Sequence, residues 1–397
     1  MATRFKEITT NLLFNKSTIF ILLIIVAFFV TYQNILLGID HFWSGNHTFY
    51  NNYVIYKYSF FHLLHNQNLY LIYPEHGDFF MYSPTFALLM GMFAYLPDST
   101  GLLLWNALNI FVLYYAIISI PNINYKNVVY IFLFILTELI LSAQSSECNL
   151  LLAGLAIMTF NFLERGKTGY ATLLIILGAF IKIFPLSICL LLLFYPKKIK
   201  AFAFLILWFI VLGALPLLLI SPSHLYAQYL NWNTFLSGDL AGSIGMSIYQ
   251  YTNYVFPIPA TKHITLLVGL LALLSPLAFI NKYSIKDFRI SYVYLLLIWM
   301  VIFNYKAESP SFIIAIVGCV VWGFNSIVTK RKTIFMLLTL FVTCFMYSDI
   351  IPYSIRHQYF NYDFIKPLMP TLCFIVILIE MYKMKKDSSS LRESNTA

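Results

Sequence analysis

Long apolar runs separated by short polar connections recur along the chain from residue 17 to residue 384. Thirteen segments of this kind can be recognised, at residues 17–37, 84–96, 101–120, 128–142, 149–164, 168–181, 184–196, 200–221, 264–280, 290–304, 311–328, 332–348 and 364–384. A helix needs about 20 apolar residues to cross a bilayer, whereas a run of about 10 to 14 is more often interfacial or re-entrant. The pattern predicts an all-α integral membrane protein, a polytopic helical bundle in which some segments need not span.

Composition supports this prediction and excludes a soluble enzyme. Hydrophobic residues make up 60% of the 397 residues and charged residues only 10%, whereas soluble domains carry about 25% charged residues. The five cysteines are odd in number, lie in or beside apolar runs and form no C-x-x-C pair, so they are expected to be small buried hydrophobes. The first apolar segment is longer than a signal-peptide core and is predicted to be a retained helix.

The distribution of basic residues predicts the topology. The net charge of +9 comes from short basic clusters between apolar runs, which indicates the positive-inside rule and no nucleic-acid partner. If the 13-residue segment Pro84–Leu96 does not cross, twelve helices span, both termini are cytoplasmic and 19 of the 25 basic residues face the cytoplasm. The other side then holds nine acids: Asp40, Glu75, Asp78, Asp98, Glu147, Asp239, Glu308, Asp349 and Asp363. If Pro84–Leu96 crossed as well, this asymmetry would collapse.

Residues 168–196 could form one long helix with Lys182 near its middle. Basic clusters flank both ends, at Arg165 and Lys167 and again at 197–200, and both are expected on the cytoplasmic side. The chain is therefore predicted to cross and return as two short helices, with Lys182 and Pro185 at the outer apex.

Residues 1–384 are predicted to form a single transmembrane domain, followed by a polar cytoplasmic tail at 385–397. Its two larger outer loops, at 38–100 and 221–263, are rich in Tyr, Trp, Asn and His and are expected to carry juxtamembrane helices. The cytoplasmic connections are short, so any chemistry is expected on the outer face. The sequence contains no P-loop, G-x-G-x-x-G, H-E-x-x-H or G-x-S-x-G motif.

Several short motifs then occur in a recognisable order: Asp40 just after the first helix, Leu69-Tyr70, Tyr82-Ser83-Pro84, Leu96-Pro97, Trp105-Asn106, Ala143-Gln144 to Asn149, and Lys182-Ile183-Phe184-Pro185. This order resembles glycosyltransferase family 87 (the DUF2029 domain) of the GT-C superfamily, over residues 15–330. The match departs at Asn52-Tyr53, where family spacing from Leu69-Tyr70 would place Asp-Phe. Either this chain has an insertion after Asp40, or the family's acid has moved to Asp78 or Glu75.

The resemblance implies a GT-C-type bundle that transfers a monosaccharide with inversion on the extracytoplasmic face, without a metal or other cofactor. The implied donor is a polyprenyl-phosphate sugar taken from the membrane, carrying a mannose-like or other hexose or pentose. A lipid or glycan would be the acceptor, and the plasma (inner) membrane the location. Membrane lipids are then expected partners.

Phosphate is a weakly basic leaving group, so one carboxylate base and cations for the phosphate would suffice. Asp40 is the first candidate for the base and Asp78 the second. The candidates for substrate binding are Lys182, Lys306, Glu308, Glu75, Tyr82, Gln144 and Arg356. Glu138, inside a predicted span, is expected to make an interhelical hydrogen bond.

Two other functions remain open from the residues. A transporter or flippase would line a pathway with Lys182, Glu138 and Glu308, although no convincing internal repeat is present. A glycan polymerase or ligase would share the outer site but use a lipid-linked oligosaccharide.

The topology can be checked by cysteine labelling from outside the cell. We expect a membrane-impermeant maleimide to modify Asp98→Cys and to leave Lys126→Cys unmodified, because the predicted topology puts these positions on opposite sides of the membrane. Labelling at position 126 would contradict this topology.

Overall fold

The computed structural model describes residues 15–39, 47–239, 245–258, 261–325, 329–346, 351–352, 354–355, 358 and 365–385. Within these ranges the chain is helical and forms no β-strand, apart from an isolated bridge between Ile39 and Thr48. The chain divides into two compact units, Met1–Leu186 with Lys200–Ser243, and Ser187–Ile199 with Ile244–Ala397. The predicted all-helical fold class is confirmed.

Five of the described helical segments are long and apolar enough to cross a membrane: Ser17–Leu37, Asp98–Ile118, Tyr125–Gln144, Lys198–Leu218 and Thr261–Ala278. Shorter apolar helices cover Pro84–Ala94, Asn149–Glu164, Thr168–Ile181, Phe184–Phe194 and Ser309–Asn325. A helical membrane protein is therefore confirmed at this level, while the figure of twelve spans stays a prediction.

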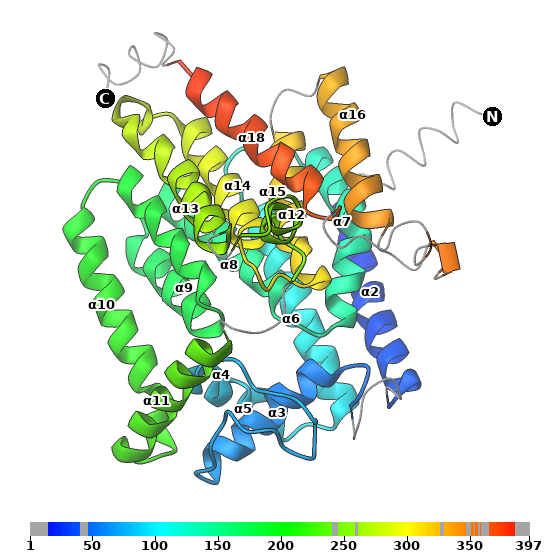
Figure 1. The fold of residues 1–397 in the computed structure, drawn as a ribbon, viewed down its shortest axis with the longest axis vertical. Helices are drawn as coiled ribbons and strands as arrows, with labels where there is room; N and C mark the ends of the chain where they lie inside the picture. The colour runs from blue at the N-terminus through cyan, green and yellow to red at the C-terminus, as the bar shows by residue number, and fades with distance from the viewer. Residues whose placement is uncertain are drawn as a thin grey trace. The chain divides into compact units, whose positions relative to one another are not determined.

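The first unit is built around five packed helices, shown in Figure 1 from blue to green. These are α2 (Lys16–Leu37), α6 (Asp98–Ile118), α7 (Tyr125–Gln144), α8 (Asn149–Glu164) and α9 (Thr168–Ile181). Helix α2 packs against α6 and α7, and α8 packs against α6 and α9. The unit also contains α10 (Lys198–Ala214), whose hydrophobic side chains are largely exposed, as expected of a helix facing lipid.

Helices α6 and α8 of this unit pack closely against each other. Gly154 lies where a Cβ atom would come within 2.9 Å of Val112 Cγ1 and 3.0 Å of the Leu113 backbone nitrogen. Small residues allow such approaches between membrane helices, where dispersion and not water exclusion drives packing. The neighbouring turn between α7 and α8 is thereby held against α6.

One end of the first unit (Figure 1) carries four further helices: α3 (Asn51–Leu64), α4 (Pro84–Leu89), α5 (Gly91–Ala94) and α11 (Pro222–Asp239). The Ser83 hydroxyl caps α4 by accepting a hydrogen bond from the Phe86 N–H at 3.1 Å, and Pro84 occupies the first turn. The segment predicted not to cross thus consists of two helices of 6 and 4 residues, far short of the roughly 20 that a span requires.

A helix break occurs at Lys182. Helix α9 ends at Ile181, Lys182 is extended at φ −134° and ψ 146°, and a 3₁₀ segment, η1, covers Phe184–Phe194. In a continuous α-helix Pro185 would have no N–H to donate to the Ile181 carbonyl, and its ring would clash with that carbonyl. The sequence-based prediction of a junction at Lys182 agrees with this geometry.

The second unit surrounds α14 (Lys286–Ile302), in which every side chain from Ile290 to Ile302 is buried. Helices α15 (Phe312–Asn325) and α18 (Leu368–Lys383) pack against it. The remaining described elements of this unit are α12 (Ile248–Val255), α13 (Thr261–Leu274), η3 (Ser275–Ala278), η4 (Ile280–Lys282), η5 (Ser309–Ser311), α16 (Lys330–Thr339) and η6 (Leu340–Phe345). In the first unit, η2 (Leu215–Leu218) directly follows α10.

Candidate functional site

The candidate site is built on the turn between α7 and α8, in the first unit. Ser146 has a φ of +56°, a left-handed conformation that non-glycine residues seldom adopt. Three successive carbonyl groups here each accept a hydrogen bond from a side chain of a different helix: Asn34 Nδ2 to Gln144 O (2.8 Å), Asn52 Nδ2 to Ser145 O (2.9 Å) and Trp105 Nε1 to Ser146 O (2.8 Å). Hydrogen bonds from α2, α3 and α6 therefore fix this turn. They satisfy its backbone carbonyls and stabilise its left-handed conformation.

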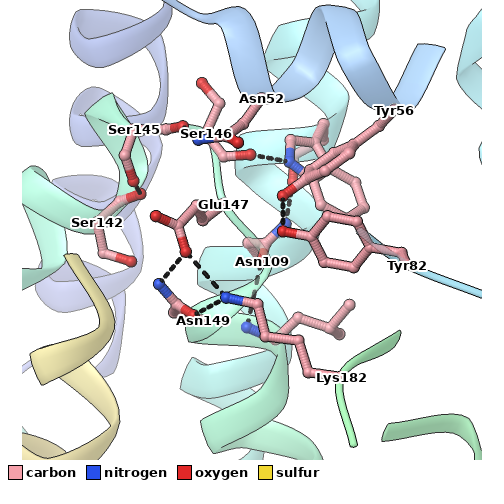
Figure 2. Close-up of polar contacts among 12 residues, drawn as sticks. Asn52, Tyr56, Tyr82, Asn109, Ser142, Ser145, Ser146, Glu147, Asn149 and Lys182 are labelled. Carbon is pink, nitrogen blue, oxygen red and sulfur yellow. Dashed lines mark hydrogen bonds and ion pairs between the residues drawn. The ribbon is translucent and has the colours of Figure 1, made fainter. Parts of the chain in front are cut away.

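The turn presents Glu147, whose carboxylate pairs with Lys182 (Figure 2). The Lys182 ammonium donates to Glu147 Oε2 at 3.0 Å and to Asn149 Oδ1 at 3.1 Å. Asn149 Nδ2 donates to the same Glu147 oxygen at 2.7 Å, so the three side chains form a closed set of contacts. The side chain of Glu147 is 5% exposed, whereas that of Lys182 is 29% exposed. The lysine side chain, unlike that of its partner, is thus partly exposed.

Buried tyrosines line the other side of the lysine. The Lys182 Nζ lies 6.0 Å from the centroid of the Tyr82 ring, and the Tyr82 and Tyr56 hydroxyl groups are 2.7 Å apart. The Ser83 hydroxyl donates to the Phe180 carbonyl, which joins α4 to the end of α9 beside Lys182. These contacts place the Tyr-x-Pro motif, the end of α9 and the α7–α8 turn around one cation.

This arrangement can bind an anion. An ammonium group has three N–H donors, and Lys182 donates to Glu147 Oε2 and to Asn149 Oδ1. In low-dielectric surroundings a preorganised cation stabilises developing negative charge more strongly than it would in water. Within the described part of the chain, no group of three or more His, Cys, Asp or Glu side chains is arranged to hold a metal ion.

Of the predicted site residues, Tyr82 lies beside Lys182. Gln144 ends α7 just before the turn, but its side chain donates to Gln33 Oε1 at 2.7 Å. Lys306 and Glu308 belong to the second unit, between α14 and η5. Asp40 and Arg356 lie outside the described residues.

Glu75 and Asp78 lie in the loop between α3 and α4. Glu75 Oε1 is 3.7 Å from His62 Nε2, and the His62 ring stacks on Tyr73 with a centroid separation of 3.7 Å. Asp78 Oδ1 accepts a hydrogen bond from the next backbone N–H, that of Phe79, at 2.7 Å. In the described part of the chain, neither carboxylate pairs with Lys182.

Glu147 was not among the predicted site residues and belonged only to the acids predicted on the outer side. A usable signal was present, since an acid and a lysine that both border short apolar helices in one membrane protein tend to pair. Asn149 was noted only as part of the motif order that resembles the family. Its contacts with both Lys182 and Glu147 depend on the geometry of the turn.

Protonation of the buried His62 is expected to weaken the fold. Burial lowers the pKa of the His62 imidazole, and the nearby Glu75 offsets only part of this effect. The unfolded chain, with a histidine pKa of about 6.5, then binds protons more readily than the folded protein, so the free energy of unfolding should fall as the pH drops below that value. The melting temperature of the protein in detergent between pH 7.5 and 5 should show this decline.

His62→Gln should make the decline shallower, whereas His263→Gln, at an exposed position of α13 in the second unit, should leave it as in the unmodified protein. Parallel pH profiles for His62→Gln and the unmodified protein would contradict the assignment.

Comparison with known families supports glycosyl transfer. The model of glycosyltransferase family 87 matches residues 80–304, which is more than half of the chain and includes Tyr82, the α7–α8 turn and Lys182. No curated protein matches the chain. The match confirms the family that the motif order indicated and favours an enzyme over a transporter. The chain is thus a membrane glycosyltransferase and belongs to glycosyltransferase family 87.

Proposed function

We propose that the protein transfers a monosaccharide from a polyprenyl-phosphate sugar to a lipid or glycan acceptor, with inversion, on the extracytoplasmic face of the plasma membrane. The sugar is mannose-like or another hexose or pentose. The observation that carries the proposal is the Lys182 ammonium, held at a helix junction by Glu147 and Asn149 on a side chain that is partly exposed. For a lysine on membrane-embedded helices, the phosphate of a lipid is the anion expected to bind.

The chemistry fits the residues around Lys182. When the glycosidic C–O bond to phosphate breaks, negative charge accumulates on the leaving phosphate, and a fixed ammonium stabilises that charge without proton transfer. Tyr82 would pack beside the phosphate or the first sugar atoms. We assign supporting contacts with substrate to Gln144, Glu75, Lys306, Glu308 and Arg356, as the sequence predicts.

The acceptor hydroxyl must lose a proton as it attacks the anomeric carbon, which requires a base on the face opposite the phosphate. We assign this role to Asp40 and keep Asp78 as the alternative. The hydrogen bond that Asp78 accepts from Phe79 is local and leaves its second oxygen for such a role.

Substitutions at Lys182 test phosphate binding. Lys182→Met keeps much of the packing and removes the charge, so we expect turnover to fall by about 10²-fold or more. Lys182→Arg should retain partial activity, since it keeps the charge but changes its reach and geometry. The measurement is transfer from polyprenyl-phosphate mannose to a membrane glycolipid extract, with a pentose donor assayed in parallel.

Lys167→Met is the matched control, because Lys167 borders the opposite end of the same helix, α9, and is exposed. It should leave transfer unchanged. Normal transfer by Lys182→Met would refute phosphate binding by Lys182.

The base is tested separately. Asp40→Asn should fold and bind the donor but lose about 10² to 10⁴ in turnover, the usual contribution of a general base. Asp98→Asn serves as a control, since Asp98 pairs with Lys57 at 2.6 Å and has no proposed role in catalysis. If Asp40→Asn retained its turnover and Asp78→Asn lost it, the base would be Asp78.

A further inference from the structure

We propose that Glu147 is a positioning residue that competes with the donor phosphate for Lys182, so that donor binding exchanges one anionic partner of the lysine for another. This inference rests on the proposed function and adds a role for a residue that the motif order did not single out. It starts from the contrast in exposure across one ion pair, 5% for Glu147 and 29% for Lys182.

Glu147 is held in place more firmly than Lys182. Its backbone belongs to a turn whose carbonyls are bound from α2, α3 and α6, and its Oε2 accepts hydrogen bonds from both Asn149 and Lys182. Lys182, in contrast, extends from a helix end on four flexible methylene groups. In an exchange of partners the carboxylate would stay fixed and the ammonium would move.

The charges of the site make this exchange necessary. Lys182 and Glu147 together are neutral, so a phosphodiester carrying one negative charge meets no net attraction until the ammonium turns toward it. A carboxylate 3.0 Å from that ammonium also repels the incoming phosphate in a medium of low dielectric constant. Glu147 therefore weakens donor binding while holding the lysine ready for it.

The same carboxylate acts more strongly on the product. Transfer of the sugar converts a phosphodiester with one negative charge into a phosphomonoester with about 1.5 to 2 negative charges at pH 7. Repulsion from the fixed Glu147 grows with that charge, and the return of Lys182 to Glu147 restores the neutral pair. Glu147 thus favours release of polyprenyl phosphate after each transfer.

Glu147 is poorly placed to be the catalytic base itself. An inverting displacement puts the attacking hydroxyl and the leaving group on opposite faces of the sugar ring. A carboxylate that shares an ammonium with the leaving phosphate lies on the leaving side, so its contribution is to hold and release the lysine. The assignment of the base to Asp40 or Asp78 is unaffected.

The experiment measures binding of farnesyl phosphate, a short phosphomonoester probe, to the purified full-length protein in detergent. Glu147→Gln removes the competing charge and keeps the side-chain shape, so we expect the probe to bind at least about fivefold tighter, a typical lower limit for coupling between two sites. Product inhibition of sugar transfer by the probe should strengthen in parallel. Glu164→Gln, at the other end of α8, is the matched control and should change neither.

The gain must also depend on Lys182. In the double variant Glu147→Gln/Lys182→Met the tighter binding should disappear. Glu147→Asp, which keeps the charge but withdraws it by one methylene group, should bind with an affinity between those of the unmodified protein and Glu147→Gln, and it provides a second test if Glu147→Gln does not fold.

Unchanged or weaker binding by Glu147→Gln, with binding that still depends on Lys182, would overturn the competition and leave the proposed function standing. A purely structural ion pair gives that result, with a lower melting temperature alone. If Lys182→Met bound the probe as well as the unmodified protein, phosphate binding by Lys182, and the proposal that rests on it, would fail instead.

Discussion

The Lys182 ammonium must keep hydrogen-bonding partners although it lies where two apolar helical segments meet. An ammonium transferred from water to an apolar region is costly unless it is paired and hydrogen-bonded. Glu147 and Asn149 meet this requirement, with Nζ contacts of 3.0 and 3.1 Å. These two partners are positioned by a turn that contains a left-handed residue. The carbonyls of that turn accept hydrogen bonds from three other helices.

This chain of requirements explains why the first unit packs as it does. Asn34, Asn52 and Trp105 are polar or partly polar residues on otherwise apolar helices, and the side chain of each donates a hydrogen bond to a carbonyl of the turn. The absent side chain of Gly154 lets α8 approach α6, which carries Trp105. The features that stabilise this part of the bundle therefore also orient the cation that we assign to the donor phosphate.

The helical membrane fold, the short segment at Pro84 and the junction at Lys182 could be predicted because each has a local cause. Segment length separates spanning from interfacial helices, and Pro185 with its flanking basic clusters indicates a break. The pairing of Lys182 with Glu147 could not be predicted, since the two residues are 35 positions apart and meet only through the packing of α8 against α9. Glu75 and Asp78 were grouped with the site by their place in an outer loop, but their described contacts are with the local backbone and with His62. Asp40 stays a sequence-based assignment.

The length of α9 links the site to the thickness of the bilayer. Its 14 residues span about 21 Å, whereas the hydrocarbon core is about 30 Å thick. In the predicted topology, Arg165 and Lys167, both exposed, place the far end of this helix at an aqueous interface. Lys182 can then sit at the level of lipid phosphates only where the bilayer thins around the protein or the helix is drawn inward, at a cost that rises with each ångström of mismatch. For the donor that we propose, lipid chain length would then affect the site, because it would set how far the phosphate must descend to meet the lysine.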